Sequence, residues 1–265
     1  MYATNYVKAT TIADAASRLD AADDGKLLAG GMTLLPTLKQ RLANPDCLVD
    51  LAGCDLAGIS DDGQSIRIGA MTRHVDVANS PVVQKAIPAV AHLAGHIGDR
   101  QVRNRGTIGG SVANNDPSAC YPSAVLALGG TVHTQNRSIA ADEFFTGMFD
   151  TALDEDEIIT AISLPKPEKA GYVKFPNPAS RYAMVGVFVA KFADGVRVAV
   201  TGAGEDGVFR ATDIEAALDA DFSVGAIDKV SVSADGLMSD IHASADYRAH
   251  LIAEMARRAV TACCG

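Results

Sequence analysis

The sequence predicts an α+β fold, in which short helices and short strands alternate irregularly along 265 residues. Several short stretches carry apolar residues at helical spacing, and paired strand-like stretches flank Asp194-Gly195, a strong two-residue hairpin signal. The elements lack the regular rhythm of βαβ units, which argues against a doubly wound parallel sheet. The length suits one to three domains with a substantial core.

Residues 1–50 predict helix, strand, helix and strand in that order. Residues 11–22 show helical spacing of apolar side chains, and the apolar stretch 26–29 runs into Gly30. Thr33 suits the start of the second helix, and residues 47–51 resemble another short strand.

The central part predicts further short elements. Residues 65–70 alternate like a strand, and Thr72 and Ser80 are suitable caps for two short helices. Residues 87–97 again have helical spacing, whereas residues 106–117, rich in Gly, Asn, Asp and Pro, break the periodicity.

Beyond this break the elements are again defined by periodicity. We expect a helix at 121–128, strands at 131–134, 158–164, 185–192 and 196–201, and a last helix at 246–261. Pro165, Pro167 and Gly171 mark a linker, and Thr212 with Glu215 matches a capping box.

Composition and charge exclude several classes of partner. The chain has 23 Lys and Arg against 32 Asp and Glu, a formal net charge of -9, which argues against nucleic acid and anionic membranes. The longest uncharged stretch, 117–136, contains Pro and Gly and predicts no membrane-spanning helix. There is no signal-peptide pattern and no C-x-x-C pair, so we expect a cytoplasmic protein with reduced thiols and no integral membrane segment.

Two glycine-containing loops share one design. Residues 28–35 read Leu-Ala-Gly-Gly-Met-Thr-Leu-Leu, and residues 107–114 read Thr-Ile-Gly-Gly-Ser-Val-Ala-Asn. Paired glycines allow positive φ and close approach of a ligand, and successive amides can then form an anion-binding nest. The hydroxyls of Thr33 and Ser111 would be additional donors. Two facing nests would hold a diphosphate, although each Gly pair alone also fits an ordinary tight turn.

With their surroundings, these loops resemble the FAD-binding medium subunit of the molybdenum hydroxylases, the group of carbon monoxide dehydrogenase and xanthine dehydrogenase. The similar segments follow the family's order and cover most of the chain. They are Ala-Gly-Gly at 29–31, Ile-Gly-Ala-Met-Thr at 68–72, Gln-Val-Arg-Asn-Arg-Gly-Thr-Ile-Gly-Gly-Ser at 101–111, Asn-Asn-Asp-Pro at 114–117, Lys-Phe at 174–175 and Ser-Arg-Tyr-Ala-Met-Val-Gly-Val at 180–187.

The resemblance implies two α+β subdomains of the PCMH type that enclose FAD, and a small C-terminal α+β domain with an antiparallel sheet. We expect the FAD-binding domain at 1–168, with subdomains at about 1–55 and 56–168. The C-terminal domain, of the carbon monoxide dehydrogenase flavoprotein type, would span 169–265.

The resemblance also implies which residues contact FAD. The two Gly loops would bind the diphosphate and ribityl chain, Ile97 and Ile159 would make apolar contacts, Lys174 would lie near the flavin, and Tyr182 would shield its ring. The implied set is Leu28, Ala29, Gly30, Gly31, Met32, Thr33, Leu34, Leu35, Ile97, Thr107, Ile108, Gly109, Gly110, Ser111, Asn114, Asp116, Ile159, Lys174 and Tyr182. Cys120 stands where many relatives have Asp, so it is left out, and Asp116 could supply the missing acceptor.

In the family this subunit receives electrons from a small 2Fe-2S subunit, and a large molybdenum-cofactor subunit oxidises the substrate, commonly within a heterohexamer. FAD then passes the electrons to an external acceptor, and this chain needs no catalytic acid, base, nucleophile or metal.

Two alternatives stay open: a stand-alone FAD-dependent oxidase or dehydrogenase, with His74 and His96 as weak candidates for a covalent flavin link, and a non-catalytic assembly protein that has lost FAD.

Four other motifs fit structural roles at least as well as functional ones. The Gly-x-Gly-x-x-Gly at 202–207 is expected to be a hairpin turn, because two carboxylates would lie beside a pyrophosphate. His92 and His96 suit a partly buried helix face, and residues 154–157 a solvated acidic turn. The cluster of Arg100, Arg103 and Arg105 fits either ordinary surface charge or contact with an acidic partner or a phosphate.

Overall fold

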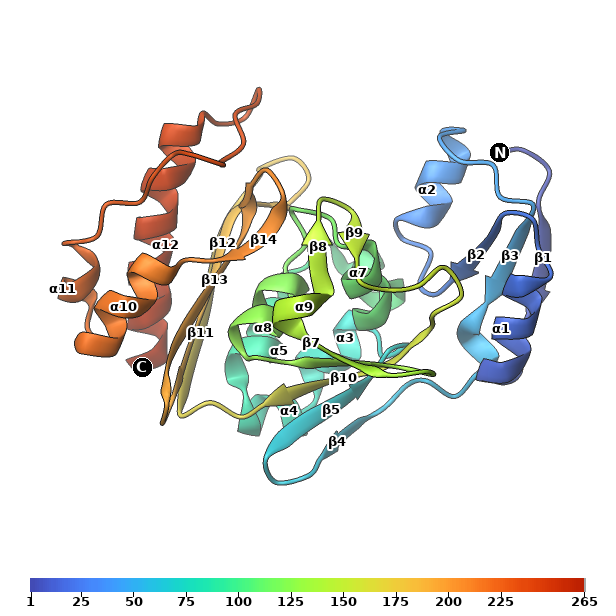
Figure 1. The fold of residues 1–265 in the computed structure, drawn as a ribbon, viewed down its shortest axis with the longest axis horizontal. Helices are drawn as coiled ribbons and strands as arrows, with labels where there is room; N and C mark the ends of the chain where they lie inside the picture. The colour runs from blue at the N-terminus through green and yellow to red at the C-terminus, as the bar shows by residue number, and fades with distance from the viewer. Residues whose placement is uncertain (265) are drawn as a thin grey trace.

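Three sheets of three to five strands follow one another along the part of the chain that the structure describes. The computed structural model describes residues 1–264. Figure 1 shows the sheets side by side, from the blue N-terminal strands through the cyan and green centre to the orange C-terminal strands. Among residues 1–264, no helix is long and apolar enough to cross a membrane.

The N-terminal sheet is parallel and has the strand order β1-β3-β2. Its elements are β1 (Asn5–Lys8), α1 (Ile12–Asp20), β2 (Gly25–Leu28), α2 (Leu34–Lys39), β3 (Cys47–Asp50) and the short 3-10 turn η1 (Leu51–Gly53). The side chain of Thr11 caps α1 by accepting a hydrogen bond from the amide of Asp14, at 3.0 Å. Because β2 ends at Leu28, residues 29–33 connect it to α2 at the carboxyl edge of the sheet.

The central sheet is antiparallel, with the order β4-β5-β10-β6-β7. Its strands are β4 (Ile59–Asp61), β5 (Ser65–Gly69), β6 (Thr131–Thr134), β7 (Ser138–Ala140) and β10 (Ile159–Pro165). The other central elements are α3 (His74–Asn79), α4 (Pro81–Ala86), α5 (Pro88–Gly95), α6 (Arg100–Arg105), α7 (Ile108–Asn114), α8 (Tyr121–Ala127), α9 (Ala141–Phe144), β8 (Phe145–Gly147) and β9 (Asp150–Thr151).

Two local expectations for this part are wrong. The aperiodic segment 106–117 contains helix α7, and Thr107 caps it by accepting a hydrogen bond from the amide of Gly110 at 3.2 Å. Thr72 caps no helix, because its hydroxyl exchanges hydrogen bonds with the backbone of Gly58. The predicted cap at Ser80 is present, since its hydroxyl accepts from the amide of Val83.

The C-terminal sheet is antiparallel and is covered on both faces. Its strands are β11 (Lys169–Pro176), β12 (Ala183–Phe192), β13 (Gly195–Gly204) and β14 (Gly207–Arg210), and its helices are α10 (Thr212–Ala220), α11 (Val224–Ile227) and α12 (Ala245–Cys264). Phe188 packs in the same core cluster as the central helices, whereas Val187 and Val189 pack with residues of α12. Burial on both faces explains why β12 is apolar along its length instead of alternating.

Both predicted hairpins of this sheet form. The two loop residues between β12 and β13 are Ala193 and Asp194, one position earlier than the Asp-Gly pair suggested, and Gly195 begins β13 with φ +149°. The Gly-x-Gly-x-x-Gly motif is a hairpin turn in which Gly204 pairs with Gly207.

The predicted capping box at α10 does not form. Ala211 is the N-cap residue and makes no side-chain cap, while the carboxylate of Glu215 is buried. That carboxylate accepts a hydrogen bond from the amide of Val198, at 2.7 Å, and forms an ion pair with Arg210. Glu215 therefore joins α10 to β13 and β14.

We predict that Glu215→Ala lowers the free energy of unfolding by about 2 to 3 kcal/mol, because it leaves a buried amide and a half-buried guanidinium without their acceptor. Thr212→Ala, at the exposed position that a capping box would use, should change it by less than about 0.5 kcal/mol. Urea titration of the three proteins measures both values. A loss of about 1 kcal/mol in Thr212→Ala would instead indicate a functioning cap.

Candidate functional site

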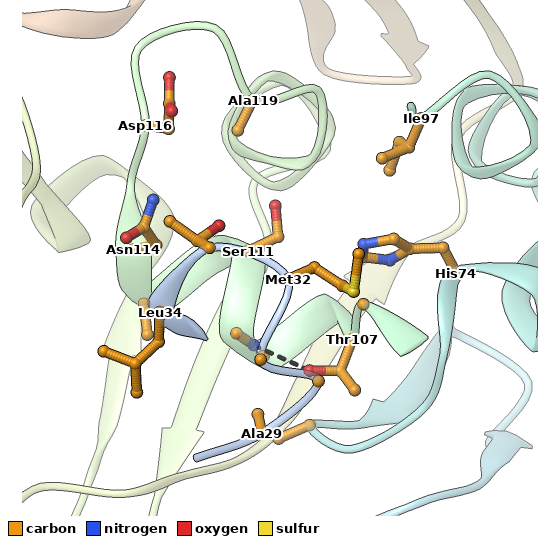
Figure 2. A pocket seen from close by; sticks show the side chains of 18 of the residues that line it. Ala29, Met32, Leu34, His74, Ile97, Thr107, Ser111, Asn114, Asp116 and Ala119 are labelled. Carbon is orange, nitrogen blue, oxygen red and sulfur yellow. Dashed lines mark hydrogen bonds between the residues drawn. The ribbon is translucent and has the colours of Figure 1, made fainter. Parts of the chain in front are cut away.

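A cavity of about 420 Å³ lies where the N-terminal sheet meets the central helices and the first strand of the C-terminal sheet (Figure 2). All but three of the residues expected to contact FAD line it: Ala29, Gly30, Gly31, Met32, Thr33, Leu34, Ile97, Thr107, Gly109, Gly110, Ser111, Asn114, Asp116, Ile159, Lys174 and Tyr182. The structure thus brings together residues from both Gly loops and from positions about 150 residues apart.

The other three expected residues, Leu28, Leu35 and Ile108, do not line the cavity. Leu28 and Leu35 pack beneath Gly31, where an added Cβ would lie 3.2 Å and 2.9 Å from their Cδ1 atoms. Ile108 is fully buried in the central core. Their side chains support the two loops and do not line the cavity.

The two Gly loops are in direct backbone contact. A Cβ added to Gly30 would lie 2.1 Å from the carbonyl oxygen of Arg105 and 2.8 Å from Cα of Gly106, which precedes the second loop. A Cβ added to Gly109 would lie 2.6 Å from Cβ of Ala70. These glycines therefore allow close packing of backbone on backbone, and Gly31, with φ +72°, is the one of the four that needs a left-handed conformation.

The backbone amides of the two loops differ in whether they already have hydrogen-bond acceptors. Within residues 1–264, the N–H groups of residues 30–33 have no hydrogen-bond acceptor. In the second loop the amides of Ile108 and Gly109 donate to the carbonyls of Thr72 and Ala70, at 3.1 Å and 2.9 Å. The amides of Gly110 and Ser111 donate to Thr107.

The expectation of two amide nests is therefore wrong for the second loop, which forms the first turn of α7. That loop instead presents side chains to the cavity, and Figure 2 shows Ser111 and Asn114 there beside the first loop. Four consecutive unpaired amides in the first loop, with the hydroxyl of Thr33, fit an anionic group such as a diphosphate.

Lys174 is held by neighbouring backbone and is not free in the cavity. Its ammonium donates to the carbonyls of His96 and Arg181, at 2.7 Å and 2.8 Å, and contacts Sγ of Cys120 at 3.6 Å. These contacts use all three of its protons. Cys120, which is left out of the expected set of FAD contacts, also lines the cavity.

Tyr182 follows Arg181 in the turn that Lys174 holds, and its side chain lines the cavity while 51% exposed. Burial within the wall raises the pKa of its hydroxyl, and the carboxylate of Asp116 raises it further. The phenol therefore remains neutral at physiological pH, and its ring is a flat apolar surface at the mouth of the cavity.

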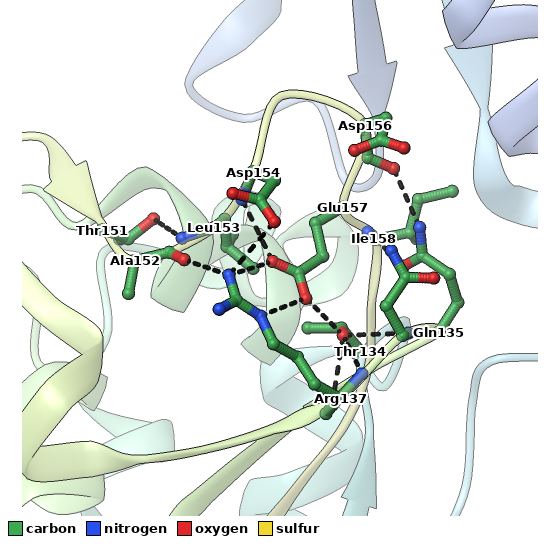
Figure 3. A network of polar contacts seen from close by, with 11 residues as sticks. Thr134, Gln135, Arg137, Thr151, Ala152, Leu153, Asp154, Asp156, Glu157 and Ile158 are labelled. Carbon is green, nitrogen blue, oxygen red and sulfur yellow. Dashed lines mark hydrogen bonds and ion pairs between the residues drawn. The ribbon is translucent and has the colours of Figure 1, made fainter.

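The loop between β9 and β10 forms another wall, and a polar network fixes it (Figure 3). Contrary to the expected solvated turn, the side chain of Glu157 is fully buried. It accepts hydrogen bonds from Arg137 at 2.8 Å and 2.9 Å, from Thr134 at 2.7 Å, and from the amide of Asp154 at 3.0 Å. The hydrogen bonds from Arg137 are the main cause that lowers the pKa of Glu157 to about 2.

The same network holds the backbone of this loop. Arg137 also donates to the carbonyl of Ala152 at 2.7 Å, and Gln135 bonds the carbonyl of Asp156 and the amide of Ile158. The hydrophobic residues of this loop and of the start of β10 line the cavity. They are Leu153, Ile158 and Ile159.

The remaining motifs have structural explanations. Arg103 donates to the carbonyls of Ile97 and Gly98, at 3.0 Å and 3.1 Å, and so fixes the turn that carries Ile97. Arg100 and Arg105 are exposed and do not line the cavity. His92 on α5 and His96, the residue that follows the last turn of α5, are both exposed, not partly buried as expected, and their ring centroids are 4.1 Å apart.

His74, which the sequence offered only as a weak candidate for a covalent flavin link and not among the expected FAD contacts, lines the cavity although it is only 4% exposed. Burial is the main cause that lowers the pKa of its imidazole to about 4, with a further effect from Arg103, so the ring is neutral at pH 7. No local pattern marks it, because its place depends on the contact of α3 with the segment before α7.

Comparisons with known proteins agree with this geometry. A family model described as an FAD binding domain in molybdopterin dehydrogenase matches residues 2–167. The nicotine 6-hydroxylase medium subunit of Paenarthrobacter nicotinovorans is 36% identical, over 97% of this chain and 96% of that relative. The carbon monoxide dehydrogenase medium chain of Hydrogenophaga pseudoflava is 32% identical, over 90% and 89% respectively.

The fold gives the same assignment. A chain of reconstituted CO dehydrogenase from Oligotropha carboxidovorans superposes with a TM-score of 0.91 at 30% identity, covering 99% of this chain and 98% of that one. The protein therefore belongs to the FAD-binding medium subunits of molybdenum-hydroxylase-type dehydrogenases, and it is an oxidoreductase subunit whose cofactor is FAD.

Proposed function

We propose that this chain relays electrons within a three-subunit molybdenum hydroxylase. A small 2Fe-2S subunit would deliver the electrons, a large molybdenum-cofactor subunit would oxidise the substrate, and an external acceptor would receive them. Relatives named as medium subunits align with it over nearly their whole length, which supports this role over a stand-alone oxidase. The proposal includes a cytoplasmic heterohexamer with two copies of each subunit.

The observation that carries the proposal is the row of unpaired amides at residues 30–33 on the wall of the 420 Å³ cavity. We propose that these amides and the hydroxyls of Thr33 and Ser111 bind the diphosphate of FAD. Tyr182 and Ile97 would enclose the ring, and Ile159 would make an apolar contact. When bound, FAD supplies reversible redox chemistry, and the chain controls its position and its access to solvent.

We propose that Lys174 positions the turn that carries Tyr182. Because its three protons are used by His96, Arg181 and Cys120, it fixes the turn that presents Tyr182 to the cavity and contributes one positive charge at that end. Asp116, whose carboxylate accepts from the amide of Ser118 at 2.8 Å, would be the acceptor that faces the cofactor beside Tyr182.

We also propose domains at 1–168, divided near residue 55, and at 169–265. Two observations support this division: each sheet is built from one continuous part of the chain, and three residues separate the end of β10 at Pro165 from the start of β11. The C-terminal sheet nevertheless contributes Lys174 to the cavity, so the proposed domains would share one site.

We expect the chain, tagged and expressed in its native host, to co-elute with iron, molybdenum and flavin on size exclusion. Flavin in the complex should be reduced by substrate, whereas the isolated FAD-loaded chain should not, because the oxidising centre lies in another subunit. Absorption spectra and metal analysis measure both. Substrate oxidation by the isolated chain would indicate the stand-alone enzyme, and absence of flavin would indicate the assembly protein.

Gly30→Ala should weaken FAD binding at least tenfold, about 1.4 kcal/mol. Its Cβ would lie 2.1 Å from a carbonyl oxygen, so the first loop must move away from the second. Gly225→Ala is the matched control, because its Cβ meets one atom within 4 Å, at 3.8 Å. Flavin fluorescence titration of apo-protein measures both affinities, and equal affinity in Gly30→Ala and wild type would contradict the proposed contact.

Arg137→Met should lower the free energy of unfolding by about 2 kcal/mol at pH 7, because the buried Glu157 carboxylate loses its main donor. Since folding lowers the pKa of Glu157 to about 2, its contribution is complete above the unfolded pKa of about 4.5 and is lost as pH falls towards 2. The difference between wild type and variant should therefore shrink from pH 7 to pH 3 in urea titrations.

The control for that series is Arg258→Met, which removes an exposed helix-surface pair with Glu254 and should cost less than about 0.5 kcal/mol at either pH. A difference between wild type and Arg137→Met that stays constant from pH 7 to pH 3 would show that the Arg137–Glu157 ion pair does not stabilise this wall.

A further inference from the structure

His74 is a polar group placed in the wall of the cofactor cavity. It is the first residue of α3, and Figure 2 shows its imidazole pointing towards the thioether of Met32, between Thr107 and Ile97. These neighbours belong to two different parts of the proposed site, the loop at the diphosphate and the apolar contact at the ring. His74 therefore lies at the junction between the two parts.

Neither ring nitrogen of His74 has a hydrogen-bond partner among residues 1–264. Its Nδ1 is buried and has none among the described residues, and the ring as a whole is 4% exposed. Burial of an unpaired donor or acceptor is unfavourable, and native structures rarely retain such groups without a ligand, a water or a functional reason. The neutral ring has one donor and one acceptor nitrogen.

The ring is nevertheless held in place by its surroundings. The amide of His74 donates to the carbonyl of Gly106 at 2.9 Å, and the ring of Tyr121 lies 5.3 Å away, centroid to centroid. A Cβ on Gly106 would lie 2.5 Å from Nε2 of His74, so glycine at 106 provides the space that the imidazole occupies. The position of the ring is thus fixed by packing, and its hydrogen-bonding capacity is left unused.

We propose that His74 is a cofactor-binding residue that hydrogen-bonds a hydroxyl of the ribityl chain of FAD. This inference rests on the proposed site, in which the ribityl chain must run from the first loop towards Ile97 and Tyr182. A hydroxyl both donates and accepts, so it pairs with a neutral imidazole in either tautomer. The hydroxyl pairs with one ring nitrogen, which we assign to Nε2, because Nδ1 is completely buried.

The test compares His74→Leu, His74→Gln and the wild type, with His250→Leu on the exposed side of α12 as the control. Apo-protein is titrated with FAD and with an FAD analogue in which hydrogens replace the ribityl hydroxyls. His74→Leu should bind FAD roughly three- to tenfold more weakly, and His74→Gln should recover part of the affinity, as expected for one neutral hydrogen bond. Wild type and His74→Leu should bind the analogue equally.

A second readout does not depend on a variant. In the wild type, the imidazole ¹⁵N resonances of His74 should shift when FAD is added, whereas those of His250 should not. Unchanged His74 resonances with FAD bound, or equal FAD affinity in wild type and His74→Leu, would overturn the inference and leave the proposed cofactor site intact. Equal losses for FAD and the analogue would also overturn it, because they indicate a packing role. Failure of the wild type to bind FAD would overturn the proposed site itself.

Discussion

The contact between the backbone of Gly30 and that of Arg105 and Gly106 is the constraint on which the site depends. With an added Cβ only 2.1 Å from a carbonyl oxygen, no residue other than glycine allows the first loop to lie against the segment before α7. This contact places the loop that follows β2, a strand of the parallel N-terminal sheet, beside the start of α7 in the central part of the chain. Other walls of the cavity come from the turn that carries Ile97 and from the loop fixed by Arg137.

The two loops contribute in different ways. The amides of the second loop are already satisfied by Thr72, Ala70 and Thr107, so α7 is a rigid platform before any ligand binds. The amides at 30–33 have no acceptor within the part of the chain that the structure describes, so the first loop retains the donors that an anionic ligand requires. Lys174 and Glu157, each with several fixed partners, hold the opposite walls without facing a ligand as free charges. Such preorganisation lowers the entropy cost of binding a long, flexible cofactor.

Much of the fold could be predicted from local sequence signals, and the failures have a common physical cause. Helical spacing, the cap at Ser80 and hairpin residues near 194 and 205 act within a few positions, so the elements that they predict are present. Glu215 and Glu157 instead bind partners on distant strands, which spacing within one helix or turn does not reveal. Glycines in the first turn of α7 suggested a loop, but Gly109 is required there by contact with Ala70. His74 carries no motif, because its environment is built by three separate segments.

Amide hydrogen exchange, measured residue by residue with and without FAD, tests the central claim most directly. Without the cofactor, the amides of residues 30–33 should exchange rapidly, whereas those of Ile108, Gly109 and Gly110 should already be protected. Adding FAD should slow exchange at residues 30–33 strongly and change the second loop little. Rapid exchange at residues 30–33 in the FAD-saturated protein, or new protection confined to the second loop, would contradict the account.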